Sequence, residues 1–149
     1  MSGASSPAIL PTLGFALVRD TLIYCSRADE ASHEDWDRWL GRLAASDFSK
    51  LLIFAAHSPP NAKQRASVAA FWKKSGRATP ITAIVSDSVV TRASVTVFQW
   101  LLQDTSARSF RARELGEALA WLGTSASVAD VTSLLLRLKP EETTSHKGL

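Results

Sequence analysis

The run Leu51-Leu52-Ile53-Phe54-Ala55-Ala56 decides how this chain of 149 residues folds. Six apolar residues follow one another without alternation, and the run stops abruptly at His57-Ser58-Pro59-Pro60. A short apolar run with no polar side is typical of a strand buried on both faces, as in a parallel sheet covered by helices. The run therefore predicts an α/β protein.

The chain downstream of this strand alternates between helical and extended patterns. A helix predicted from about Asn61 to Ser75 ends at Gly76, the residue type that favours a left-handed helix terminus. The later predicted elements are a buried strand at 81–85, a helix that starts at the cap cluster Ser86-Asp87-Ser88 and runs to about Gln103, a short strand at 109–111, and a helix at 114–122 that ends at Gly123.

The chain upstream begins with two short apolar runs, at residues 15–18 and 22–25, which are separated by a polar turn and predict an antiparallel hairpin. Helical spacing follows. Ser32 is the expected N-cap of this helix, and Glu34 and Asp35 suit the positive end of the helix dipole. The apolar stripe of this helix consists of Trp36, Trp39, Leu40, Leu43 and Ala44.

A further amphipathic helix is expected within residues 124–139, capped by Ser127 and stopped by Pro140. Its apolar stripe must be covered either by its own domain or by a partner or dimer mate. Residues 1–11 are predicted to be a flexible leader and residues 140–149 a flexible tail. The stripe consists of Val128, Val131, Leu134, Leu135 and Leu138.

The predicted order is β-β-α-β-α-β-α-β-α with the extra C-terminal helix. Strands that alternate with helices imply right-handed crossovers and a largely parallel sheet, here of about five strands, with the opening hairpin as an antiparallel edge. We predict one such domain over residues 12–123.

Three stretches of this order resemble the SpoIIAA-like branch of the STAS and SEC14-like fold group. They are the strand at 51–56 with its proline-rich turn and the basic helix that follows, residues 81–88 with Arg92 on the next helix, and residues 109–122. STAS domains are non-enzymatic interaction partners in bacterial regulation, and SEC14-like relatives bind lipids, so the resemblance implies a binding module.

The resemblance also implies a candidate phosphorylation site at Ser58. In the anti-sigma antagonists of this group, the switch is a serine in an Asp-Ser-Ser-Gly-like turn after the strand that corresponds to residues 51–56. The turn here reads Ala56-His57-Ser58-Pro59-Pro60. Ser58 is in place, whereas the preceding acid and the following glycine of the family pattern are missing.

The polar residues most suited to binding lie in the loops after two predicted parallel strands. Such loops emerge at one edge of the sheet, where open α/β sheets bind ligands and where helix N-termini favour anions. The alternative is that Ser58, Asn61 and Asp87 only cap helices, which stabilises each helix by about 1 kcal/mol. The candidates are His57, Ser58, Asn61, Ser86, Asp87, Ser88 and Arg92.

Catalysis is not expected from this set. His57, Ser58 and Asp87 resemble a base, a nucleophile and an orienting acid, but adjacent side chains in an extended segment point to opposite sides and no nucleophile elbow surrounds the serine. The three histidines have no metal-ligand spacing, and the sequence contains no glycine-rich phosphate loop. We expect no cofactor and no metal.

Charge and targeting signals narrow the remaining classes. The net charge of +3 comes from basic residues that are spread along the chain, which disfavours nucleic-acid binding. The absence of a signal-peptide pattern or a long apolar run predicts a cytoplasmic protein without membrane insertion, and the single Cys25 reads as a buried hydrophobe. The leading hypothesis is a non-enzymatic regulatory module that binds a protein. A ligand- or lipid-binding domain and a hydrolase are the alternatives.

Overall fold

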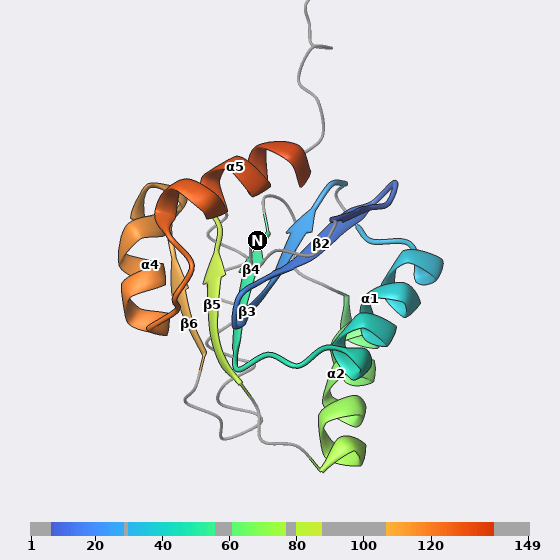
Figure 1. Cartoon of the computed structure of the whole chain (residues 1–149). Helices are drawn as coiled ribbons and strands as arrows, with labels where there is room; N and C mark the ends of the chain where they lie inside the picture. Colours follow the sequence, from blue (N-terminus) through green and yellow to red (C-terminus); the bar gives the residue numbers. More distant parts are fainter. Residues whose placement is uncertain (1–6, 29, 56–60, 77–79, 88–106, 139–149) are drawn as a thin grey trace, which may run out of the picture.

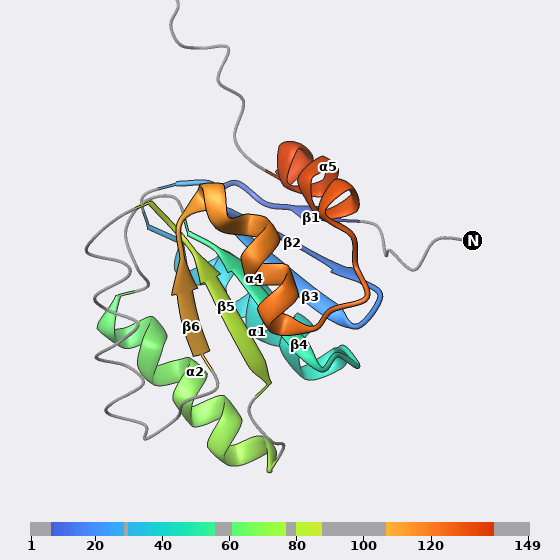
Figure 2. The ribbon, with the colours of Figure 1, turned by 90° about the vertical axis from the view of Figure 1, so that its left-hand side faces the viewer.

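The computed structural model describes residues 7–28, 30–55, 61–76, 80–87 and 107–138. These residues form one six-stranded sheet with helices on both faces (Figures 1 and 2). The strands are β1 (Ala8–Ile9), β2 (Leu13–Val18), β3 (Thr21–Ser26), β4 (Lys50–Phe54), β5 (Ile81–Val85) and β6 (Ala107–Phe110). The helices are α1 (His33–Ala45), α2 (Ala62–Ser75), α4 (Leu115–Leu122) and α5 (Val128–Leu138), with a short 3-10 turn, η1 (Ala112–Glu114), before α4.

The strands lie in the sheet in the order in which they occur in the chain. β1, β2 and β3 pair antiparallel, and β3, β4, β5 and β6 pair parallel. The predicted α/β class, with a mixed and mostly parallel sheet, is therefore confirmed. The predicted hairpin is the β2–β3 pair, and its turn places Arg19 at a φ of 55°.

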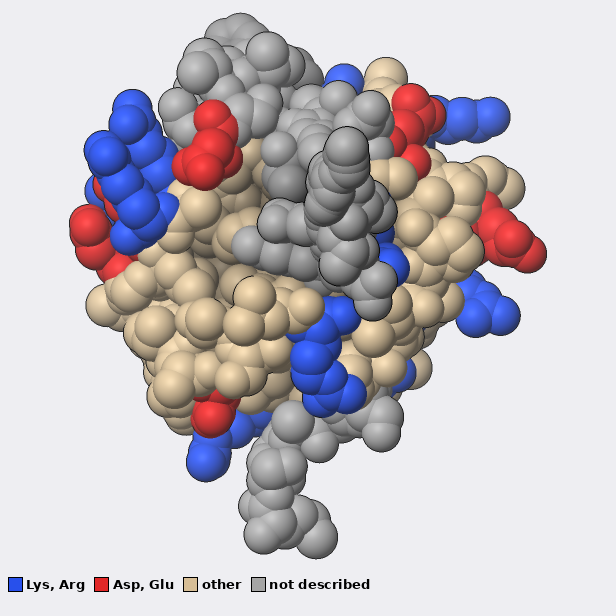
Figure 3. Space-filling model, turned by 90° about the horizontal axis from the view of Figure 1, so that it is seen from above, with Lys and Arg blue, Asp and Glu red and all other residues tan. Residues whose placement is uncertain are grey.

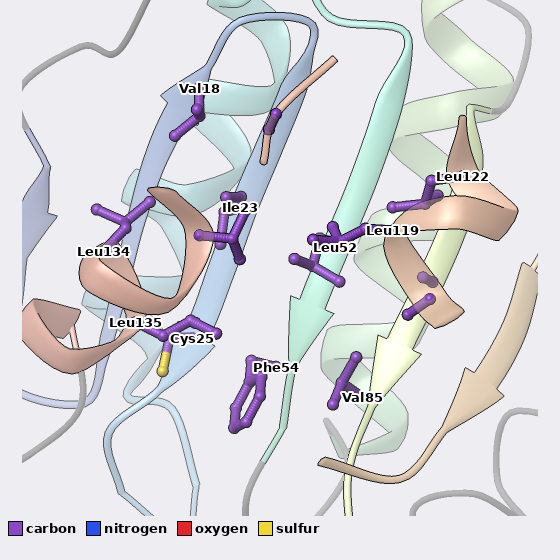
Figure 4. Packing of buried hydrophobic residues seen from close by; sticks show 14 of the residues in the cluster. Val18, Ile23, Cys25, Leu52, Phe54, Val85, Leu119, Leu122, Leu134 and Leu135 are labelled. Carbon is purple, nitrogen blue, oxygen red and sulfur yellow. The ribbon is translucent and has the colours of Figure 1, made fainter. Parts of the chain in front are cut away.

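One face of the sheet is covered by α4 and α5 (Figure 4). Ile23 and Cys25 of β3 and Leu52 of β4 are fully buried on this face. Alternate residues of a strand point to opposite faces, so these inward positions are two residues apart. The helices contribute Leu119 and Leu122 from α4 and, from α5, Val131, Leu134, Leu135 and Leu138.

The opposite face is covered by α1 and α2 and is rich in aromatic side chains. Tyr24 of β3 packs edge-on against Trp36, with ring centroids 6.2 Å apart, and tilted against Trp39 at 5.0 Å. Trp36 and Trp39 are buried, as their helical spacing predicts, and Trp72 packs half-buried against this cluster. Trp121, on the other face, is half-buried against Phe110. Trp100 lies outside the described residues.

The first strand lies where the sequence predicts a flexible leader. Ala8 and Ile9 pair with Phe15 and Gly14, so the sheet has six strands rather than about five. The chain reverses through a turn in which the Leu10 N–H donates to the Leu13 carbonyl at 2.9 Å. A strand of two residues, flanked by Pro7 and Pro11, is too short to show a periodicity, and its geometry comes from pairing with β2.

Two members of the predicted apolar stripes are exposed. Ala44 of α1 is exposed, and Val128 at the start of α5 is 48% exposed. Both occupy the margin of their stripe, where the position around the helix axis turns the side chain away from the sheet. The helix predicted to follow Ser86-Asp87-Ser88 lies outside the described residues.

The C-terminal helix packs on its own domain. Four residues of its stripe are at most 7% exposed, and its last turn lies against the N-terminal strands, since a Cβ added at Gly14 would approach Leu138 Cδ2 to 3.0 Å. Ser127 accepts a hydrogen bond from the Asp130 N–H at 3.1 Å, which is the predicted cap. No helix among the described residues is long and apolar enough to cross a membrane.

The contact at Gly14 gives a stability prediction. A Gly14→Val substitution would push side-chain atoms into Leu138 and towards the Ala8 carbonyl, which lies 3.3 Å from the added Cβ. We expect this overpacking to lower the free energy of unfolding by about 1–3 kcal/mol, measured by urea denaturation.

The matched control is Gly41→Ala on α1, where an added Cβ meets nothing within 4 Å. This change should raise stability by up to about 1 kcal/mol because alanine favours a helix over glycine. Unchanged stability of Gly14→Val would show that α5 does not press on β2 at this point.

Candidate functional site

The carboxyl ends of the parallel strands meet at one edge of the sheet, as expected. Backbone hydrogen bonds join neighbouring strands at this edge. The Ala55 N–H donates to the Val85 carbonyl, and the Ser86 N–H donates to the Phe110 carbonyl, both at 2.9 Å. The loops after β5 and β6 therefore leave the sheet side by side. Of the candidate residues, the structure describes Asn61, Ser86 and Asp87.

Asp87 fastens two of these loops together. Its Oδ1 accepts a hydrogen bond of 3.0 Å from the Ala112 N–H, at the first residue of η1. A free N–H at the start of a helical turn needs an acceptor, and a carboxylate there also suits the positive end of the turn. The sequence predicts Asp87 as a cap for the helix that follows it directly, whereas the structure shows it bonded to a turn 25 residues further along the chain.

Asn61 caps α2, which is the alternative to a binding role that the sequence left open for this residue. Its Oδ1 accepts from the Gln64 N–H at 2.8 Å, and the Gln64 side chain accepts in return from the Asn61 N–H at 3.1 Å. This reciprocal arrangement is a capping box. The Asn61 amide also donates to Glu30 at 3.0 Å, and the Gln64 amide donates to the Ala31 carbonyl at 2.8 Å.

Ser86 is only 1% exposed, so it belongs to the interior end of β5 rather than to the surface. The bonds of Asn61 run to the loop before α1, and those of Asp87 run to the turn before α4, so the two residues act in different parts of the edge. His57, Ser58, Ser88 and Arg92 lie outside the described residues.

Two further polar contacts at this edge have no clear signal in the sequence. Arg27, which follows β3, donates from Nη1 to the Leu138 carbonyl at 2.5 Å, where the negative end of α5 favours a cation. Asp35 of α1 accepts from both the N–H and the hydroxyl of Thr12, at 2.9 and 2.5 Å. Burial raises the pKa of Asp35, but the hydrogen bonds from Thr12 and Ser32 outweigh it, so its pKa lies below the ordinary value.

Figure 3 shows the molecule from this end, because the carboxyl ends of β4 and β5 point up in Figure 1. Basic and acidic side chains both lie around its rim, with uncharged residues between them. The described part of this rim has no concentrated positive field of the kind that a nucleic-acid surface usually has.

A second polar cluster lies at the opposite edge, around Asp20 in the turn between β2 and β3. Its Oδ1 accepts from the hydroxyls of Thr21 and Thr124, at 3.0 and 2.9 Å, and from Ser125. Its Oδ2 lies 3.3 Å from Lys50 Nζ. The cluster joins the hairpin turn, the start of β4 and the segment between α4 and α5.

Asp20 is held ionised by these contacts. Partial burial raises the pKa of Asp20, but hydrogen bonds from Thr124, Thr21 and Lys50 outweigh it and lower the pKa to about 2, from an ordinary value of 3.8. The residues meet across more than 100 positions of sequence, so spacing along the chain does not reveal them. Their arrangement links the hairpin turn to the start of β4 and to the segment before α5.

The described residues contain no group of three or more His, Cys, Asp and Glu that could hold a metal ion. His33 instead pairs with Asp37 on the exposed side of α1, with Nε2 and Oδ2 3.3 Å apart.

No known family model, no curated protein and no solved structure matches this chain. The function must therefore be inferred from the arrangement of its own residues.

The role of Asp87 can be tested by stability. We expect Asp87→Ala to lower the free energy of unfolding by about 1 kcal/mol, because the Ala112 N–H loses its acceptor. Thermal and urea denaturation measure the change. A catalytic acid held in a strained position would behave in the opposite way, since its removal would stabilise the protein.

The role of Asp20 can be tested by pH. Because its folded pKa of about 2 lies below the ordinary 3.8, its contribution is present above about pH 4 and is lost as the pH falls towards 2. Asp20→Asn should lower stability at pH 7 by roughly 1–2 kcal/mol, with allowance for solvent screening, and should flatten the loss below pH 4. Glu117→Gln, which removes a carboxylate from an exposed position of α4, is the matched control.

Proposed function

We propose that this chain is a non-enzymatic regulatory module that binds a protein partner through the carboxyl edge of its sheet and the helices that adjoin it. The observation that carries the proposal is the set of hydrogen bonds that the side chains of Asn61 and Asp87 form. These side chains hold neighbouring loops together through short hydrogen bonds rather than converging on a reacting position.

A surface of loops that are held together by hydrogen bonds is suited to the recognition of a protein partner. Loops on a rigid scaffold keep their shape when a partner arrives, which reduces the conformational entropy that binding must overcome. The loop before α1 is fastened to the start of α2 by Asn61 and Gln64, and the loop after β5 is fastened to η1 by Asp87. Arg27 adds a link from the end of β3 to the end of α5.

The resemblance to SpoIIAA-like and STAS domains supports the same function. The confirmed α/β plan, with an antiparallel hairpin followed by parallel strands and their helices, is the plan on which that resemblance rests. Ser58 falls in the stretch between β4 and α2, the place of the regulatory serine in the family pattern.

The proposal is tested by capture from cells of the source species with the full chain as bait. Wild type, Ser58→Asp and a control, Asp47→Asn at an exposed position before β4 on the opposite edge of the sheet, are compared by quantitative mass spectrometry after chemical cross-linking. We expect a specific protein to be cross-linked to the carboxyl edge. We also expect Ser58→Asp to change its yield while thermal stability stays within about 0.5 kcal/mol of wild type, as is usual for surface substitutions.

Two outcomes contradict the proposal. One is the absence of any protein that is enriched over an unrelated bait. The other is a partner that cross-links elsewhere and is captured equally by wild type and Ser58→Asp.

A further inference from the structure

The positive charge of the described residues is concentrated on α2. The described residues include thirteen Lys and Arg and ten Asp and Glu, and α2 holds four of the former and none of the latter. Nine basic and ten acidic residues therefore remain for the rest, which is nearly balanced. The sequence already shows a basic helix at this position, but its net charge of +3 and the spread of its basic residues do not show that the rest of the described chain is nearly balanced.

The inner side of α2 is attached to the domain. Gln64 donates to the Ala31 carbonyl, and Ser67 Oγ accepts from Trp36 Nε1 at 2.9 Å. Val68, Phe71 and Trp72 pack against the aromatic cluster between α1 and the sheet. These contacts fix the rotation of the helix about its axis and determine which residues face outward.

The outward side of α2 consists of lysine and alanine. Lys63, Ala66, Ala70 and Lys74 follow at steps of three and four residues, which places them on one face of a helix, and Lys73 lies beside them. All five are exposed. We call these five residues the basic face of α2; it extends about 16 Å along the helix axis at 1.5 Å per residue.

We propose that the basic face of α2 binds an acidic helix of the protein partner. The inference rests on the proposed function and names the chemistry of the surface that the partner presents. Alanine at Ala66 and Ala70 allows another helix to approach closely, since the distance between packed helices depends on the side chains at the contact. The lysines at both ends would then meet Glu or Asp side chains of that helix.

The composition of this face favours a protein over other anionic surfaces. Single-stranded nucleic acid is bound with aromatic side chains on which bases stack, and here Phe71 and Trp72 pack inward. An interfacial membrane helix presents large apolar side chains beside its lysines, whereas this face presents alanine. Complementary charge on a partner helix also accelerates and orients association.

The first experiment uses the full chain and a defined probe. The probe is an alanine-rich peptide of about 20 residues with regularly spaced glutamates, long enough to form a helix. Titration of the isotopically labelled protein by NMR should shift amide resonances of α2. The affinity should fall as salt is raised from 50 to 300 mM, at roughly the range where screening becomes effective.

Matched variants separate charge from fold. Replacing Lys63, Lys73 and Lys74 by Gln keeps the helix propensity and should weaken peptide binding at least about tenfold, since three complementary charges are lost. The control replaces Arg19, Arg38 and Arg108 by Gln, which removes the same charge from exposed positions in the turn between β2 and β3, on α1 and on β6, away from the carboxyl edge, and should leave binding within about twofold. Circular dichroism verifies that all variants remain folded.

A steric variant tests the helix contact itself. Ala66→Gln with Ala70→Gln keeps every charge but enlarges the centre of the face, so peptide binding should weaken while binding to any extended polyanion would persist. The inference is overturned if wild type shows no shifts on α2, if the control weakens binding as much as the lysine variant, or if a DNA duplex or phosphatidylserine vesicles bind this face more tightly than the peptide at equal ionic strength.

Capture from cells distinguishes this inference from the proposed function. If wild type and the triple lysine variant capture the same partner equally, the module binds a protein but not through the basic face, and the inference fails alone. If wild type captures nothing specific, the proposed function fails as well. Loss of the partner in the lysine variant, with retention in the arginine control, supports both.

Discussion

The burial of β3 on both faces is the constraint on which the rest of the structure depends. All six of its residues are buried, and the strand pairs antiparallel with β2 on one side and parallel with β4 on the other. Its alternate residues belong to the two separate cores, with Ile23 and Cys25 towards α4 and α5 and Leu22 and Tyr24 towards α1 and α2. A strand in this position requires helices on both sides, because the large side chains of Leu22, Ile23 and Tyr24 would otherwise be exposed to water.

The two ends of β3 are where the chain needs polar partners, and both are supplied from distant parts of the sequence. At its start, Asp20 joins the hairpin turn to Lys50 and to Thr124. At its end, Arg27 reaches the last turn of α5. α5 is thereby held at both its ends to the hairpin whose core face it covers. The helix that sequence analysis left open to a partner is thus part of the domain.

The candidate site combines the carboxyl edge of the sheet, whose loops are held by hydrogen bonds, with α2, which carries basic but no acidic residues. Asn61 and Asp87, selected from sequence as binding candidates, are capping residues that give the edge its shape. Shape and charge are then separate properties: the carboxyl edge carries charges of both signs, while α2 carries positive charge alone. A partner that engages both would be oriented by the edge and selected by the charge of the helix.

The sequence by itself determined the α/β class, most of the strands and helices, and Ser32 as the N-cap of α1. These features are predictable because apolar periodicity and capping residues act locally. The α2 helix begins after Asn61 and ends at Gly76, whose φ of 70° suits glycine, as the pattern predicts. Only the tertiary structure decided the rest. β1 exists because β2 offers an edge with which to pair, Asp87 caps a turn that lies 25 residues away, and Asp20 gathers hydroxyl groups more than 100 residues apart. Such contacts depend on which strands become neighbours, and a local pattern carries no information about that. The basic face of α2 is of the same kind, because lysines are visible in the sequence but their common exposure follows from the side of the helix that the core fixes.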